Sequence, residues 1–154
     1  MACPLTIVGG GRDARQCRRG AAQMTVSATG RASHALPWLF LLYAAASLLH
    51  FAHNAEYLAQ YPHLPSSWSR AEVYLAWCVV SALGILGYVL YLRGRRLLGL
   101  SLLALYASLG FAGLLHYTRA PFGHHTAMMN ITIWAETAAA ASLFVNVVVL
   151  AARR

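Results

Sequence analysis

Four long apolar segments constrain this chain more than any other feature of its sequence. They lie at about residues 35–59, 71–92, 97–118 and 127–152. Each is long enough to cross the hydrocarbon core of a bilayer, about 30 Å thick, as an α-helix that rises 1.5 Å per residue. Only 10% of the 154 residues are charged, whereas soluble domains carry about a quarter. Because the connections are short, the sequence predicts an all-α, four-helix transmembrane bundle with antiparallel up-down-up-down topology over residues 35–152.

The expected helix ends carry residues that are typical of such positions. Pro37 falls in the first turn of the first segment, where its missing N–H costs nothing. Pro62 follows the first segment and cannot continue it. Ser69 and Glu72 have the spacing of a capping box at the start of the second helix. Small residues expected to let the helices approach closely are Gly84, Gly87, Gly110, Gly113 and the alanines at 138–141.

The arginines indicate how the chain is oriented. Residues 1–34 carry five arginines and three consecutive glycines at 9–11, which favours a flexible basic tail; Met24 offers an alternative start. Ten arginines lie in this tail, in the 93–96 turn and at the C-terminus, against two in the other connections. The positive-inside rule therefore predicts that both termini are cytoplasmic. Basic charge divided among tails and one turn does not favour nucleic-acid binding, and three cysteines without a paired spacing predict no disulfide framework.

Polar residues gather at the ends of the segments that this topology brings to the non-cytoplasmic side. They are His50, His53, Asn54, Glu56, Tyr57, Glu72, His116, Tyr117, His124, His125, Asn130, Thr132, Trp134, Glu136 and Thr137. At 100° per residue, His50, His53, Asn54 and Tyr57 are expected to share one face of the first helix, and His125, Met129, Thr132 and Glu136 one stripe of the fourth. A polar side chain turned to hydrocarbon costs a few kcal/mol, so both stripes are expected to face protein or water.

Imidazole and carboxylate groups on facing helices are common metal ligands in bundles, which leads to a metal-site hypothesis. The metal is expected to be divalent, zinc or iron, and the predicted ligands are His50, His53, His116, His125 and Glu136. Glu56 and Glu136 are the predicted catalytic carboxylates. Asn54, Tyr57 and Asn130 are predicted to orient the ligands through hydrogen bonds. The expected substrate is a lipid-like or other small apolar molecule that enters from the outer leaflet.

Other interpretations of the same residues stay open. The histidines and Glu136 can satisfy one another as a hydrogen-bonded network without chemistry. A haem or quinone electron carrier would use His50 or His53 together with His116 as axial ligands. In a transporter or proton relay, His53, Glu56 and Glu136 would be titrating stations. A non-catalytic accessory subunit, alone or as a homo-oligomer, would use the cluster for stability or for binding a membrane partner.

The stretch His53-Asn54-Ala55-Glu56-Tyr57 resembles the His-x-x-Glu-Glu motif of a group of small bacterial membrane proteins. The resemblance covers this motif and the pattern of four spans. The second glutamate of the motif is replaced by Tyr57 in this chain, so the match is incomplete. The resemblance implies a multi-pass protein of the bacterial inner membrane with enzymatic work.

Overall fold

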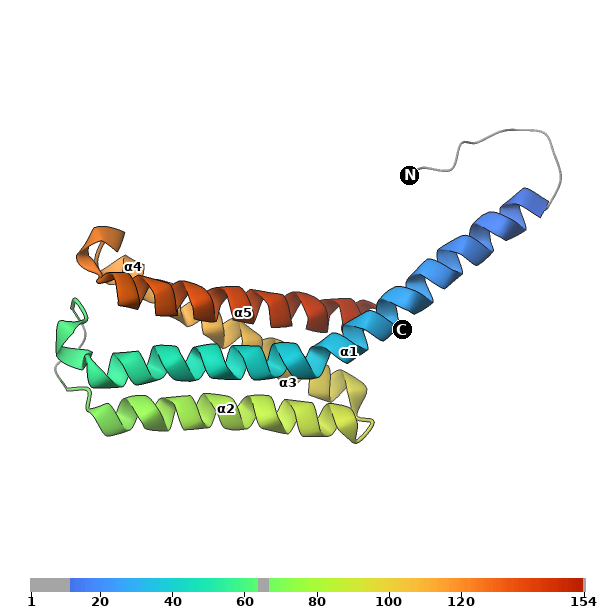
Figure 1. The fold of residues 1–154 in the computed structure, drawn as a ribbon. Coiled ribbons are helices and arrows are strands. Elements are labelled where there is room, and N and C mark those ends of the chain that lie inside the picture. The colour runs from blue at the N-terminus through green and yellow to red at the C-terminus, as the bar shows by residue number, and fades with distance from the viewer. Residues whose placement is uncertain (1–11, 64–66, 154) are drawn as a thin grey trace.

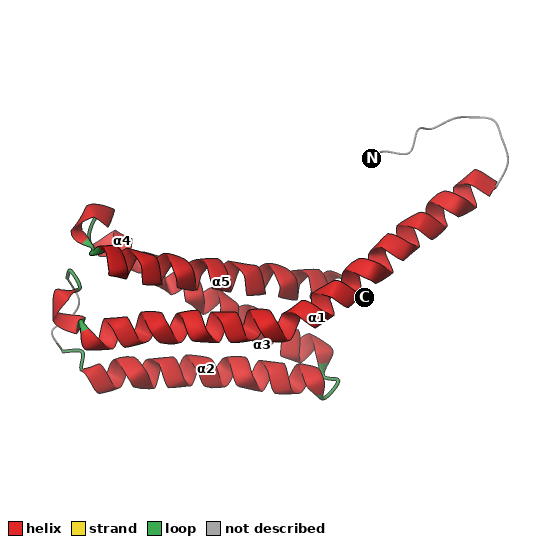
Figure 2. Ribbon diagram, in the orientation of Figure 1, coloured by secondary structure: helices red, strands yellow, loops and turns green. Residues whose placement is uncertain are grey.

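The computed structural model describes the backbone of residues 12–63 and 67–153, and the side chains from residue 32 onward. All the regular structure in this part of the chain is helical (Figure 2). The elements in chain order are α1 (Arg12–Glu56), η1 (Leu58–Gln60), α2 (Arg70–Leu92), α3 (Arg96–Leu109), η2 (Gly110–Leu115), α4 (His116–Arg119), η3 (Phe122–His124) and α5 (Ala127–Ala152).

Four helical stretches are long and apolar enough to cross a membrane, as predicted. They are Ala32–Glu56, Arg70–Leu92, Arg96–Arg119 and Ala127–Ala152. The first ends three residues before its predicted boundary, because the chain tightens into the short 3-10 helix η1. Helix α1 also begins at Arg12, within the segment predicted to be a flexible tail. That segment is rich in alanine and arginine, which favour helix; residues 1–11 of the predicted tail lie outside the described residues.

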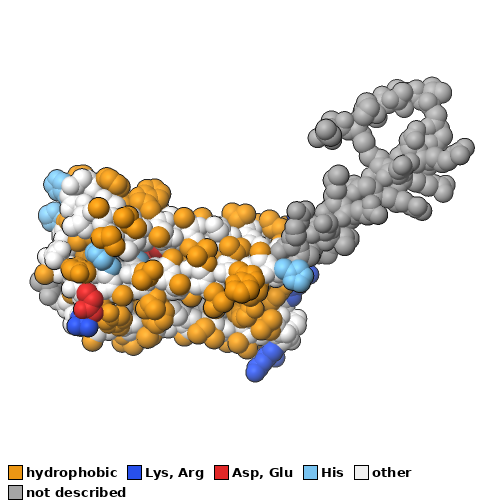
Figure 3. All heavy atoms as spheres, viewed as in Figure 1, with side chains coloured by type: hydrophobic (Ala, Val, Ile, Leu, Met, Phe, Trp, Pro, Cys, Tyr) orange, Lys and Arg blue, Asp and Glu red, His pale blue; other side chains and the backbone are white. Residues whose placement is uncertain are grey.

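The spans run alternately up and down and form one bundle (Figure 1). Helix α1 packs mainly on α5, α2 packs mainly on α3, and α3 also contacts α5. The apolar surface faces outward along the sides of the bundle, and the charged side chains visible in Figure 3 lie at its two ends. Trp38 and Val79 are 73% and 64% exposed on these sides. Apolar sides with charges at the ends match the bilayer, so the chain is an integral, multi-pass membrane protein.

Two tyrosines form the centre of the core. The Tyr43 hydroxyl on α1 donates to the backbone oxygen of Tyr106 on α3 over 3.2 Å, and both side chains are fully buried. A Cβ at Gly110 would lie 2.7 Å from the Tyr43 hydroxyl and 2.5 Å from Cβ of Ala140. A Cβ at Gly84 would lie 2.7 Å from the Tyr106 ring. The predicted role of these glycines in close helix packing is therefore confirmed.

Side chains cap helix termini at both ends of the bundle. Ser69 Oγ accepts from the Glu72 N–H, and a Glu72 carboxylate oxygen accepts from the Ser69 N–H over 2.7 Å, so the predicted capping box is present. At the other end, Arg96 donates to the carbonyl oxygens of Leu150 and Arg153. This arginine ties the start of α3 to the end of α5, where the last carbonyls lack helical partners.

The third span changes its winding halfway along. Residues Gly110–Leu115 form the 3-10 helix η2 between α3 and α4, where one continuous helix was predicted. Helix α2 packs along α3, whereas η2 packs on α5. The change of winding brings Gly113 against the polar residues of α1 and α5, so it shapes the site described next.

Candidate functional site

A histidine from α1 and a glutamate from α5 face each other inside the bundle. We call the end of the bundle that carries the α1–α2 and α4–α5 connections the distal end; the pair lies in that half (Figure 1). His50 Nε2 is 3.7 Å from Glu136 Oε2, and each residue is only 2% exposed. These two residues, both predicted as metal ligands, are therefore buried and adjacent.

Side chains of α1 and α5 hold the His50 ring in place. Its Nδ1 is 3.3 Å from the Thr132 hydroxyl oxygen, and this hydroxyl also donates to the Met129 carbonyl over 3.1 Å. Its Nε2 is 3.2 Å from Nδ2 of Asn54. The Nε2 atom of His50 therefore lies between Asn54 and Glu136.

A pocket of about 270 Å³ opens beside this pair and receives residues from all four spans. Most of its lining is apolar. The polar groups farthest from the distal end are His50, Asn54 and Glu136, and His116, Arg119 and Trp68 line the pocket from the α4 and connection side. The apolar lining is formed by Phe51, Leu58, Val73, Ala76, Leu109, Ala112 and Leu115. Pockets that bind small molecules have this character, an apolar wall with a few convergent polar groups.

Gly113 leaves the buried pair open to the pocket. A Cβ at this position would lie 3.5 Å from Glu136 Oε2 and 3.7 Å from His50 Nε2. These are ordinary contact distances, so a methyl group fits there without strain but occupies space next to both polar atoms. Glycine matters at this position because it has no side chain, and not because its backbone is flexible.

The deep end of the pocket presents hydrogen-bond acceptors. Asn54 Oδ1 is buried and has no hydrogen-bond partner among the described residues. Glu136 supplies the one carboxylate of the pocket lining. The guanidinium of Arg119 donates to the His63 carbonyl instead of approaching Glu136. The unpartnered Asn54 Oδ1 next to the Glu136 carboxyl group favours a ligand that brings its own donor.

Other histidines extend from the pocket toward the distal surface. The His116 ring lies edge-on to His50, with centroids 5.5 Å apart, and its centroid is 6.3 Å from that of His125. His125 Nδ1 is 3.2 Å from the Pro121 carbonyl, while its Nε2 is buried with no hydrogen-bond partner in the described part of the chain. The described residues contain no group of three or more His, Cys, Asp or Glu side chains able to hold a metal ion. The predicted five-residue ligand set therefore has no support from the geometry.

The predicted common face of α1 is divided in two by its contact with α5. His50 and Asn54 line the pocket, whereas His53, Glu56 and Tyr57 line a separate groove. Glu56 pairs with Arg70 over 2.7 Å and accepts from the Tyr74 hydroxyl over 2.9 Å. Glu56, predicted to be catalytic, and Tyr57, predicted to orient ligands, thus belong to a different surface from Glu136.

Asn130 holds the distal connection in place. Its Oδ1 accepts from the Tyr117 hydroxyl over 2.8 Å, and its Nδ2 donates to the carbonyls of Phe122 and His125 over 3.4 and 3.5 Å. Its predicted orienting role therefore applies to the backbone of the α4–α5 connection, and through it to His125.

Sequence reasoning missed Tyr61. The residue is 4% exposed, its hydroxyl is 2.8 Å from His53 Nδ1, and its ring centroid is 5.0 Å from that of His116. Burial raises the pKa of the Tyr61 phenol, so the hydroxyl keeps its proton in this contact with His53. The available signal was an aromatic residue directly before the proline that ends the first segment, which was interpreted only as a helix stop.

Comparison with models of protein families, with curated proteins and with solved structures finds no match to this chain. The chemistry of the site itself is therefore what indicates a function for this chain.

Proposed function

We propose that this protein binds a small, mainly apolar molecule with a hydrogen-bond-donating head, such as a phenol or another hydroxyl compound, in the pocket beside His50 and Glu136. The observation that carries the proposal is the composition of the pocket. Apolar side chains from all four spans surround the polar groups of His50, Asn54, His116 and Glu136, among which Asn54 Oδ1 has no partner among the described residues.

The head of the ligand would lie between Asn54 and Glu136. A hydroxyl donating to Glu136 Oε2 would stand next to His50 Nε2, because these two atoms are 3.7 Å apart. His50 and Glu136 would together hold or accept the ligand proton, while the apolar lining excludes water and strengthens the hydrogen bonds. This arrangement serves a binding protein and equally an acid–base step on the bound hydroxyl.

The membrane position of the pocket supports an apolar ligand. The pocket lies in the distal half of the bundle, which the arginine count predicts to be the non-cytoplasmic half, with both termini cytoplasmic. A ligand dissolved in that leaflet would enter between α2 and the third span, which supply Val73, Ala76, Leu109 and Ala112 to the pocket lining.

The test compares two ligands that differ only in the donor. Binding of 4-octylphenol and of its methyl ether, 4-octylanisole, is measured by titration calorimetry on protein in lipid nanodiscs. We expect the phenol to bind about tenfold more tightly, the effect of one buried hydrogen bond. Glu136→Leu should remove the difference, because leucine replaces the acceptor with a similar volume.

The matched control is Glu56→Leu, which removes a carboxylate outside the pocket and should keep the preference for the phenol. Equal binding of both compounds to the wild-type protein would overturn the proposal. So would a preference for the phenol that persists in Glu136→Leu.

A further inference from the structure

A second concave surface lies on the outside of the bundle, between α1 and α5. We call it the alanine groove; its volume is about 740 Å³. Its lining consists of Leu42, Ala45, Ala46, Leu49, Ala52, His53, Glu56, Tyr57, Met128, Ile131, Thr132, Ala135, Ala138, Ala139 and Ser142. The small side chains of both helices form its floor, and larger apolar side chains border it. Its only ionisable residues, His53, Glu56 and Tyr57, all lie at the distal end.

The length of the groove matches one leaflet of a bilayer. On α1 it runs from Leu42 to Tyr57 and on α5 from Met128 to Ser142, which is roughly 21 to 22 Å at 1.5 Å per residue. Half of a hydrocarbon core plus one headgroup region is about 20 to 22 Å. Toward the termini the groove ends, and large exposed side chains such as Trp38, Leu41 and Val145 take its place. A helix of a second copy would need a surface along the whole span.

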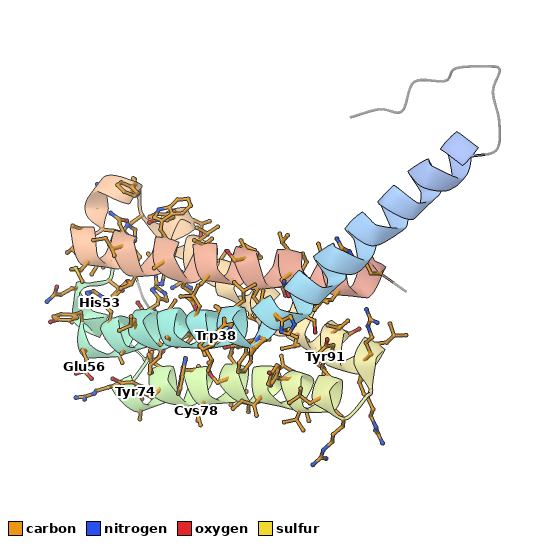
Figure 4. All side chains as sticks on the ribbon, turned by 45° about the vertical axis from the view of Figure 1, so that its right-hand side comes forward. Trp38, His53, Glu56, Tyr74, Cys78 and Tyr91 are labelled. Atoms are coloured by element: carbon orange, nitrogen blue, oxygen red, sulfur yellow. The ribbon has the colours of Figure 1, made fainter. Side chains whose placement is uncertain are left out.

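The polar end of the groove is lined by Glu56, and Arg70 adjoins the groove as the ion-pair partner of Glu56. The Glu56 carboxylate and the Arg70 guanidinium form an ion pair of 2.7 Å, with side chains 41% and 67% exposed. Figure 4 shows His53, Glu56 and Tyr74 together at this end of the bundle. His53 Nδ1 is hydrogen-bonded to the Tyr61 hydroxyl. The other ring nitrogen, Nε2, lies on the opposite edge of the ring and takes no part in that bond. A headgroup with a phosphate and an ammonium group complements such a pair, because the phosphate binds arginine and the ammonium binds the carboxylate.

We propose that the alanine groove is a binding site for one amine-bearing phospholipid of the distal leaflet. An acyl chain lies over the alanines, and the headgroup binds Glu56 and Arg70. This site is separate from the pocket beside His50 and does not depend on the function proposed for that pocket.

The test for the acyl chain is retention of phospholipid. Protein is purified from membranes containing equal amounts of phosphatidylethanolamine and phosphatidylglycerol, and bound lipid per chain is counted by native mass spectrometry. The variant Ala135→Leu, Ala138→Leu fills the groove with exposed side chains. We expect about a tenfold loss of retained lipid, because the leucines occupy the volume of several buried methylene groups.

The control is Ala82→Leu, which makes the same substitution on the exposed face of α2, outside both cavities; it should retain lipid like the wild type. The headgroup is tested by Glu56→Gln, which should abolish the preference for phosphatidylethanolamine over phosphatidylglycerol. If the double variant retains as much lipid as the wild type, the site is overturned. The site is also overturned if the wild type forms a dimer that the double variant loses, while the amount of bound lipid stays the same. An unchanged headgroup preference in Glu56→Gln would overturn the assignment of the headgroup.

Discussion

At the scale of single residues, two glycines of η2 have opposite roles although only three positions separate them. A Cβ at Gly110 would collide with Ala140 and Tyr43, whereas a Cβ at Gly113 would only touch Glu136 and His50. We predict that Gly110→Ala lowers the free energy of unfolding by about 1 to 3 kcal/mol through overpacking. Gly113→Ala should change it by no more than about 1 kcal/mol. Unfolding in mixed micelles with increasing amounts of denaturing detergent measures the free energy of unfolding of both variants. Equal losses of stability in the two variants would contradict the described packing.

The contact between His50 and Glu136 makes a second prediction at this scale. Leucine at either position leaves the other polar group buried with one partner fewer, at a cost of about 1 to 3 kcal/mol. The double substitution should cost less than the sum of the single ones, because it leaves neither group of the pair unpaired. A double-mutant cycle of unfolding free energies measures this coupling. Additive effects would show that the two side chains do not interact.

At the scale of elements, the α4–α5 connection depends on Asn130. Its three hydrogen bonds to Tyr117, Phe122 and His125 span that connection. Asn130→Leu should therefore leave the bundle folded but accelerate amide hydrogen exchange in residues 122–126 by about tenfold or more. Mass spectrometry of exchanged peptides measures the change. The rates of α2 should stay the same, and acceleration throughout the chain would mean that Asn130 supports the whole fold.

The elements also show where sequence reasoning succeeds and where it stops. Hydropathy, Pro62 and the Ser69–Glu72 capping box predicted the spans to within a few residues, since these signals are local. The prediction of one common polar face on α1 was wrong, because the line of contact with α5 separates His50 from His53. The position of that line depends on packing across the bundle. Tyr43 was missed for the same reason, since an aromatic residue in an apolar run looks alike whether it faces lipid or the core.

At the scale of the whole molecule, the arginine count predicts which end faces the cytoplasm. In a variant with serine at Cys3, Cys17 and Cys78, one new cysteine is placed at either end of the bundle, at Arg95 or at Gly123. In intact cells, a membrane-impermeant maleimide should label Gly123→Cys but not Arg95→Cys. Permeabilised cells should give labelling of both, which controls for reactivity. The reverse pattern would place the pocket in the cytoplasmic leaflet.

The whole molecule also has two separate apolar cavities, the inner pocket and the outer groove, and different polar residues lie at the end of each. The inner pocket ends at His50, Asn54 and Glu136, and the outer groove ends at His53 and Glu56. Sequence reasoning placed His50, His53, Asn54 and Glu56 around a single metal site, because they lie within two turns of one helix. In the structure the contact between α1 and α5 divides them between two cavities, for which we propose a small ligand and a lipid.

The central claim is that a ligand hydroxyl donates to Glu136, and infrared difference spectroscopy tests it most directly. Spectra of the protein in nanodiscs are recorded with and without 4-octylphenol. The account predicts a change in the carboxyl stretching bands that is absent with 4-octylanisole and absent in Glu136→Leu, and that Glu56→Leu leaves intact. No carboxyl change on binding the phenol, or the same change in Glu136→Leu, would contradict it.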